Sequence, residues 1–192
     1  NHVDIEGKGP FYTCSPEFLK PFYEVKGDLQ LGVMTDYKRY NANDFPNKSN
    51  DFIDFVRIAC HPDKIAESLK VAEDLHKKGY KIFIQLMEIQ NVGADGYIEL
   101  FQWKNKNILE SLYFADSYSA LKPEDIEKYY NKLKTIGYEK LSFHAHNELG
   151  LALENSLRAA EFGCYTIDTT FNGIGRGGGN LKLQELLENL PC

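Results

Sequence analysis

The chain has 192 residues, a length that suits one domain, and 43% of them are hydrophobic, which is enough for a hydrophobic core. Its formal net charge is −6 with acidic and basic residues interspersed, so a nucleic-acid partner, which needs a basic stripe, is not expected. No apolar run approaches the roughly 18–20 residues of a membrane span, so no membrane partner is expected either.

Six short runs rich in β-branched and aromatic residues predict strands. Their apolar residues are nearly continuous, as in strands of a parallel sheet that is covered on both faces. The predicted strands are residues 29–35, 52–60, 81–88, 111–117, 140–146 and 165–171.

Helical patterns alternate with these strands. They begin at Pro16, Pro62, Pro123 and about Leu151, and proline in the first turn is a helix-start signal. Three of them end at a glycine that suits a left-handed C-cap, namely Gly79, Gly137 and Gly163. In the last helix we expect Leu153, Leu157 and Ala160 to face inward. Residues 94–106 are the least regular stretch.

The repeated order of strand, short loop, helix and glycine predicts an α/β fold with a parallel sheet. Both a doubly wound sheet and a (β/α)8 barrel have this order. The glycine-dense stretch 173–179 contains GxGxxG only because glycine is so frequent there, and no acidic partner follows it. It is therefore no dinucleotide-binding fingerprint.

Two histidines at the end of the fifth predicted strand are the first candidates for chemistry. His144 and His146 stand two residues apart and therefore point to the same face of a strand. Two neighbouring neutral imidazoles suit a divalent metal ion, although a hydrogen-bonded polar pair is the alternative. The loop after a barrel strand builds the active face, and His146 stands at that end.

A glycine-dense loop follows about one strand–helix unit later and ends at Asn180. Its glycines, Gly177 among them, let the backbone approach a ligand closely. Asn180 can offer an amide oxygen to a cation. We expect the helix after it to present free N–H groups to an anion such as a carboxylate.

These residues carry a family resemblance. The segment HAHNELGLALENSLRAAEFG, followed by GIGRGGGN, resembles the DRE-TIM metallolyases of the HMG-CoA lyase-like superfamily. The family pattern is HxHN or HxHD, then a helix with an Asn near its start, then a glycine-rich loop ending in GN. His144 to Asn147, Asn155 and Asn180 match it. The resemblance covers about residues 111–190 specifically, and the nearest branch is the bacterial aldolases of the 4-hydroxy-2-oxovalerate aldolase type.

The resemblance implies a (β/α)8 TIM barrel in which the six predicted strands are strands three to eight. It also implies a divalent metal ion, Mn²⁺ or Mg²⁺ with Co²⁺ or Zn²⁺ as further options, held by His144, His146 and Asn180. The ion would bind a 2-oxo acid and stabilise the enolate formed when a carbon–carbon bond breaks.

The sequence departs from the family in two places. The DxTLRDG segment of the family's first strand, which supplies an Asp ligand and a catalytic Arg, is absent, and residues 1–7 resemble a broken second strand. We therefore expect one domain over residues 1–192, a barrel incomplete at its N-terminus whose C-terminal part can continue beyond Cys192. The loop before Asn180 also lacks the Cys of the HMG-CoA lyases, which argues against that member.

Several strand residues are further site candidates, each with a structural alternative. Arg57 alternates with apolar residues and points into the lumen, toward a substrate carboxylate or an internal Asp. Asp116 and Ser117 end a strand near the expected substrate, or cap the next helix. Asp168 supports a metal ligand or binds substrate. Gln85 lines the pocket or only fills the lumen, and Arg176 clamps a carboxylate or lies in solvent.

These features predict a metal-dependent aldolase that cleaves a 4-hydroxy-2-oxo acid to pyruvate and an aldehyde, with Arg57 and Asp116 in catalytic roles. A synthase that condenses an acyl-CoA with a 2-oxo acid, and a metal- or ligand-binding barrel without turnover, are the alternatives. The four cysteines form no CxxC pair, so we expect reduced thiols and a cytoplasmic location. A homodimer is expected from the barrel fold.

Overall fold

The computed structural model describes residues 9–190, in which five parallel strands form one sheet in the order β1-β2-β3-β4-β5. The strands are β1 (Gly32–Asp36), β2 (Phe55–Cys60), β3 (Lys81–Leu86), β4 (Leu109–Asp116) and β5 (Leu141–Ala145). Each strand pairs with the next one along the chain. A doubly wound sheet reverses its strand order at a switch point, whereas a (β/α)8 barrel does not, so the order indicates part of a barrel.

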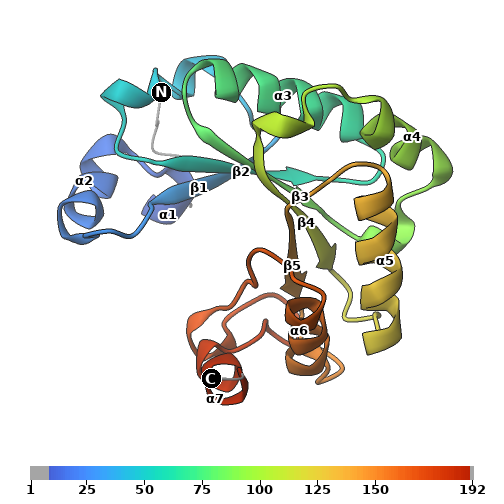
Figure 1. The fold of residues 1–192 in the computed structure, drawn as a ribbon. Helices are drawn as coiled ribbons and strands as arrows, with labels where there is room; N and C mark the ends of the chain where they lie inside the picture. Colours follow the sequence, from blue (N-terminus) through green and yellow to red (C-terminus); the bar gives the residue numbers. More distant parts are fainter. Residues whose placement is uncertain (1–8, 191–192) are drawn as a thin grey trace.

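Helices α1 and α2 precede β1, whereas α3, α4, α5 and α6 each follow one of the strands β2 to β5 and pack on one face of the sheet. Figure 1 shows α3, α4, α5 and α6 around the outer face of the curved sheet, with α1 and α2 at its β1 end. The helices are α1 (Pro10–Thr13), α2 (Pro16–Val25), α3 (Ile65–Lys77), α4 (Ala94–Gln102), α5 (Pro123–Thr135), α6 (Ala152–Glu161) and α7 (Leu183–Asn189). Within residues 9–190, every helix is too short or too polar to span a membrane.

The core lies between the sheet and these helices. In β2 to β5, one side-chain set of each strand points outward and is buried, for example Val56, Ile84 and Phe143. The alternate set points to the concave face of the sheet and is more polar, as strand geometry requires. Gln85 lies opposite Tyr113 in the β3–β4 register, which brings polar side chains of neighbouring strands together on that face.

Most predicted helix boundaries are confirmed. Gly79, Gly137 and Gly163 have φ of 94°, 95° and 85°, the left-handed conformation that favours glycine at a helix end. One predicted helix face is wrong, because α6 turns Ala152, Ser156 and Ala159 toward the sheet instead of its leucines. Small side chains let the helix backbone approach β5 closely, and the leucines cover the flank of the core.

Two other predictions from the sequence are wrong. The irregular stretch 94–106 contains helix α4, which buries Tyr97 and Leu100. Residues 165–171 do not form a regular strand. Ile167 forms a single bridge with Phe143 of β5, and Thr170 forms another with Lys182, just before α7. The segment leaves β5 after Asp168 to pair with the chain that enters α7, so its ladder is too short for a strand. Residues 1–7 and Cys192 lie outside the described residues.

The N-cap of α2 offers a small, direct test of the fold. The hydroxyl of Ser15 accepts a hydrogen bond from Phe18 N–H at 3.3 Å, which satisfies one free donor of the first turn. We expect Ser15→Ala to lower the free energy of unfolding by about 1 kcal/mol in urea titrations. Ser15→Thr keeps the acceptor and should cost much less. Equal losses in both variants would contradict this cap.

Candidate active site at the carboxyl ends of the strands

His144 and His146 point to the same face at the end of β5, as predicted. Their ring centroids lie 5.1 Å apart with the ring planes at 80°. The two residues have separate supports. His144 Nδ1 lies 2.9 Å from Asp168 Oδ2, and the backbone N–H of His146 donates to the carbonyl of Asp116 at 3.4 Å. Because the Asp168 carboxylate accepts a hydrogen bond from Nδ1, the Nε2 atom of His144 is left as the free ligand atom.

Asp168 is shared between His144 and Arg57. The guanidinium of Arg57 binds both carboxylate oxygens, with Nη2 3.0 Å from Oδ1. Burial would raise the pKa of Asp168, but the hydrogen bonds from His144 and Arg57 outweigh it and hold that pKa below its ordinary value. Asp168 is therefore an anion at neutral pH that fixes an imidazole on one side and a guanidinium on the other.

Arg57 is fully engaged inside the protein. It donates to Gln85 Oε1 at 3.2 Å and to the hydroxyl of Tyr113 at 3.0 Å, and its guanidinium carbon lies 4.1 Å from the Tyr113 ring centroid. Of the two predicted partners for Arg57, the structure has the internal carboxylate, Asp168. Gln85 belongs to the same network, so these residues form a connected polar layer on the concave face.

Asp116 ends β4 and Ser117 directly follows it, but the two side chains face different surroundings. Asp116 is fully buried, and its carboxylate accepts from Ala120 N–H at 2.8 Å and Leu121 N–H at 3.1 Å. Burial raises the pKa of Asp116, and these backbone hydrogen bonds partly offset that effect. The geometry matches the structural alternative, in which Asp116 orders the loop before α5. Ser117 accepts from Glu88 N–H at 3.0 Å and lines the pocket described below.

The glycine-rich loop folds onto the end of β5. Asn147 N–H donates to the carbonyl of Gly179 at 2.9 Å, and His146 forms an antiparallel bridge with Asn180. A Cβ atom at Gly178 would overlap the Cα of Glu148, and one at Gly179 would overlap the carbonyl of Gly173. The glycines thus permit close approach to the chain's own backbone, which sets Asn180 beside His146.

The helix after the glycine-rich loop is short, and its first N–H group is not available to an anion. Helix α7 begins only at Leu183 and has seven residues. Its first N–H, that of Leu183, donates to the carbonyl of Thr170 at 3.2 Å. The N–H group is therefore satisfied within the protein, because the chain turns back to pair with residues 165–171.

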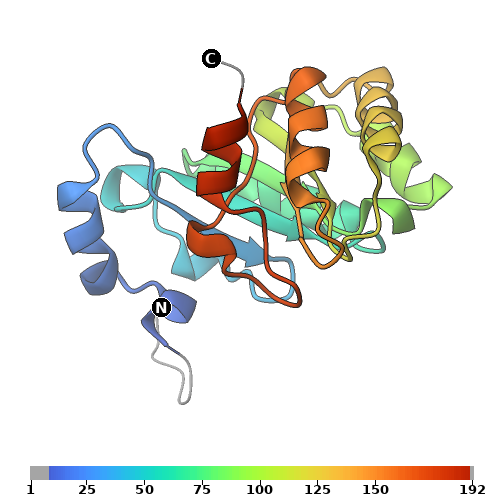
Figure 2. The ribbon, with the colours of Figure 1, turned by 90° about the horizontal axis from the view of Figure 1, so that it is seen from below.

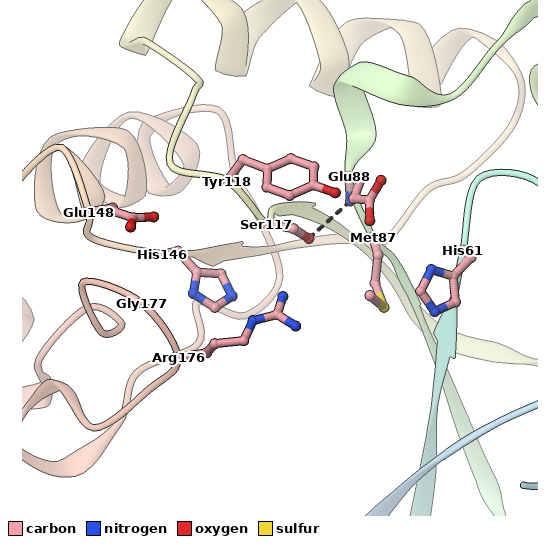
Figure 3. Close-up of a pocket in the computed structure, with 9 residues that line it drawn as sticks. All are labelled: His61, Met87, Glu88, Ser117, Tyr118, His146, Glu148, Arg176 and Gly177. Atoms are coloured by element: carbon pink, nitrogen blue, oxygen red, sulfur yellow. Dashed lines mark hydrogen bonds between the residues drawn. The ribbon is translucent and has the colours of Figure 1, made fainter.

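A pocket of about 240 Å³ opens beside His146 (Figure 3). Its lining comes from the carboxyl ends of β2 to β5 and from the glycine-rich loop, and consists of His61, Met87, Glu88, Ser117, Tyr118, His146, Glu148, Arg176 and Gly177. The volume is below the roughly 300–1,000 Å³ that is typical of drug-sized ligands, so it suits a small molecule. Figure 3 shows Arg176 reaching from the loop toward the middle of the pocket.

The predicted site residues divide into two groups. His146, Ser117, Arg176 and Gly177 line the pocket, whereas Asp116, Asn180 and the Arg57 network with Gln85, His144 and Asp168 lie outside its lining. Glu88 and Tyr118 were not predicted as site residues, although Glu88 ends one predicted strand and Tyr118 directly follows another. His61, which directly follows a predicted strand, was not predicted as a site residue either, and the structure places it in the pocket lining. Position at the carboxyl end of a strand was the available signal for all three.

The donor set beside the pocket fits a divalent cation. Asn180 Oδ1 is buried and has no hydrogen-bond partner, which is costly unless a ligand satisfies the atom. The backbone of Asn180 forms a bridge with the backbone of His146, so the two residues are neighbours. The Nε2 atom of His144 is free, because Nδ1 is the atom that contacts Asp168. Two imidazole nitrogens and an amide oxygen admit Mn²⁺, Mg²⁺, Co²⁺ or Zn²⁺. Within residues 9–190 no group of three His, Cys, Asp or Glu side chains is placed to hold a metal.

Comparison with known proteins shows the family of the chain. The HMGL-like family model matches residues 45–191. The chain is 25% identical over 185 residues to an oxaloacetate decarboxylase from Mycobacterium tuberculosis, covering 95% of this chain and 54% of the relative. It is 29% identical over 174 residues to a 4-hydroxy-2-oxovalerate aldolase from Carboxydothermus hydrogenoformans, covering 89% and 51%. The chain thus spans about half the length of these relatives.

Solved structures share the fold. The N-terminal domain of a candidate aldolase from Bacteroides vulgatus superposes with a TM-score of 0.86 at 25% identity, over 98% of this chain and 64% of that one. An HMG-CoA lyase from Brucella melitensis gives 0.70 at 15% identity, over 94% and 73%, which shows the fold alone. The sheet is part of a TIM barrel of the kind these proteins share. With the family model matched over most of its length, the chain belongs to the HMGL-like family, whose members include lyases and synthases.

Proposed function

We propose that the protein is a divalent-cation-dependent lyase of the aldolase type, which cleaves a 4-hydroxy-2-oxo acid to pyruvate and an aldehyde. The observation that carries the proposal is the pair of imidazoles beside the orphaned amide oxygen of Asn180, at the edge of a small polar pocket. The aldolases among the relatives support the choice of reaction.

His144, His146 and Asn180 would hold the cation, Mn²⁺ or Mg²⁺. When bound, the cation supplies a Lewis acid that polarises the 2-oxo group of the substrate. Asp168 holds the proton on His144 Nδ1 and so directs Nε2 outward, and Arg57 keeps Asp168 ionised. In this assignment Arg57 acts through Asp168, and Asp116 acts by ordering the loop that carries Ser117 and Tyr118.

The substrate would lie in the pocket with its carboxylate near Arg176. That guanidinium reaches into the pocket beside His146, and a guanidinium binds a carboxylate through two parallel hydrogen bonds. Ser117 and the Gly177 backbone border the same space. Gln85 and Asp168 support the site from the polar layer behind it. The homodimer and the cytoplasmic location stay predictions.

Decarboxylation of oxaloacetate is a second candidate, favoured by the M. tuberculosis relative. Loss of CO₂ from oxaloacetate and cleavage of a 4-hydroxy-2-oxo acid both break the bond between C3 and C4 of a 2-oxo acid. Both leave the enolate of pyruvate, so one cation site serves either reaction. Parallel assays with the two substrates would separate the candidates by their kcat/KM values.

Metal content tests the proposal directly. We expect the full-length protein, purified after incubation with Mn²⁺, to hold about one divalent ion per chain, as a site with three protein ligands should. The double variant His144→Ala/His146→Ala should hold none and release no pyruvate. His76→Ala, which removes an exposed histidine on α3, is the control and should behave as wild type. A wild type without bound cation would overturn the proposal.

A further inference from the structure

Two non-glycine residues at the rim of the pocket have left-handed backbones. Glu88, directly after β3, has a φ of 50°, and Ser119, just after β4, has a φ of 53°. Such conformations cost free energy in residues with a Cβ atom and persist only where surrounding contacts enforce them. Here Glu88 N–H donates to Ser117 Oγ at 3.0 Å, and Ser119 Oγ accepts from Glu148 N–H at 2.8 Å. The loops after β3, β4 and β5 are therefore tied together.

This backbone arrangement sets Glu88 and Tyr118 against each other. The Tyr118 hydroxyl lies near the Glu88 carboxylate, and Figure 3 shows the ring pointing toward that side chain. Asn91 Nδ2 donates to Glu88 Oε2 at 3.0 Å. The neighbouring Glu88 carboxylate raises the pKa of Tyr118, so its hydroxyl keeps its proton at neutral pH.

The pair lines the same pocket as His146 and Arg176. A tyrosine hydroxyl that donates its proton to a carboxylate still has lone pairs that can accept a hydrogen bond from a ligand. Glu148, the other carboxylate of the pocket, lies close to Gly177 of the glycine-rich loop instead. Tyr118 and Glu88 are thus neighbouring hydroxyl and carboxylate groups of the pocket lining.

From this geometry we infer that Tyr118, held by Glu88, takes the proton from the C4 hydroxyl of the substrate during carbon–carbon cleavage. The inference rests on the proposed aldolase function. In it Tyr118 touches the substrate and is the catalytic residue, whereas Glu88 acts through Tyr118 as its proton acceptor.

The step balances without a further reagent. The C4 hydroxyl proton passes to Tyr118 Oη as the Tyr118 proton passes to the Glu88 carboxylate. The C4–O bond becomes the carbonyl of the aldehyde, the C3–C4 bond breaks, and its electron pair forms the enolate of pyruvate. The proton on Glu88 leaves to water, and C3 takes one proton from water, so the products are neutral aldehyde and pyruvate.

Two reactions of the full-length, Mn²⁺-loaded protein separate this role from the cation site. Cleavage of a 4-hydroxy-2-oxo acid needs the hydroxyl proton to leave. Exchange of the pyruvate methyl protons with D₂O, followed by NMR, forms the same enolate but involves no C4 hydroxyl. We expect Tyr118→Phe and Glu88→Gln to lower kcat for cleavage by about 10²–10⁴-fold, the usual range for a lost general base. Both should keep the exchange rate and the cation content of wild type.

Tyr165→Phe is the matched control, because Tyr165 is 53% exposed, as Tyr118 is, and does not line the pocket. It should leave both reactions unchanged. Cleavage by Tyr118→Phe within about threefold of wild type would overturn the inference, since that is far below a general-base effect. Equal loss of exchange and cleavage would also overturn it, because the pair would then serve enolate formation. A wild type with neither reaction would instead overturn the proposed function itself.

Discussion

Asp168→Asn should lower both the stability of the fold and the affinity of the candidate site for a cation. The variant leaves the Arg57 guanidinium on the concave face without a counter-charge and deprives His144 Nδ1 of its acceptor anion. Side chains of Arg57 and Asp168 are only 18% and 17% exposed, so solvent screens the lost interaction poorly. We expect the free energy of unfolding to fall by about 3 kcal/mol, the lower end for a broken buried pair.

The same substitution should weaken cation binding by about 10–100-fold, as is usual when the carboxylate behind a metal-binding histidine is removed. Urea titration measures the stability change, and isothermal titration with Mn²⁺ measures the affinity. Glu161→Gln is the control, because Glu161 lies 2.7 Å from Arg158 in an exposed ion pair. It should cost no more than about 1 kcal/mol. Equal unfolding midpoints for both variants would show that the Arg57–Asp168 pair contributes nothing specific.

The Arg57–Asp168 pair also determines the direction in which stability changes with pH. The pKa of Asp168 is lower in the folded protein than in the unfolded chain, so the folded state binds its proton more weakly. Its contribution to stability is therefore present above the unfolded pKa and is lost as the pH falls through the lowered folded pKa. Asp168→Asn should remove that part of the acid dependence of unfolding.

Gly178→Ala should disorganise the candidate site with a smaller effect on the fold. A Cβ atom at this position would overlap the Cα of Glu148, and backbone cannot move aside as a flexible side chain can. The loop must therefore lift from the end of β5, which separates Asn180 from His146. Displacement of about 1 Å in a site can cost about 10²-fold in rate, and we expect a loss of that size in pyruvate release.

Stability should fall by about 1–3 kcal/mol in Gly178→Ala, as for other forced overlaps. Gly93→Ala is the control, because a Cβ atom there would meet nothing within 4 Å and its φ is −75°. Steady-state assays and Mn²⁺ titration of both variants check the prediction. Wild-type cation affinity in Gly178→Ala would mean that the loop does not hold Asn180 in place for the ion.

Local signals in the sequence were sufficient for much of the fold. The glycines at 79, 137 and 163 have left-handed φ values because each helix must stop there, and a residue without Cβ does so at low cost. Helix α4 was missed because its segment contains Gly96 and exposed apolar residues such as Phe101. Gly96 permits close contact with Ile65 of α3, a tertiary contact that no local pattern reveals.

Only part of the candidate site could be predicted, because local signals do not reveal contacts between distant elements. The alternation of side chains along a strand determines that His144 and His146 share a face, and the structure agrees. The partner of both Arg57 and His144 is Asp168, which is 111 residues from Arg57 along the chain. The pocket joins Glu88 and Tyr118 only because β3 and β4 are neighbours in the sheet.

The sequence by itself therefore determined the parallel α/β architecture, the shared face of the two histidines and the position of the glycine-rich loop. These depend on backbone dihedrals and on residue spacing within one element. Only the tertiary structure decided that Arg57 pairs with Asp168, that Asp116 orders a loop, and that Tyr118 meets Glu88. Those outcomes depend on contacts between elements far apart in the chain, whose free energies exist only after the sheet has brought them together.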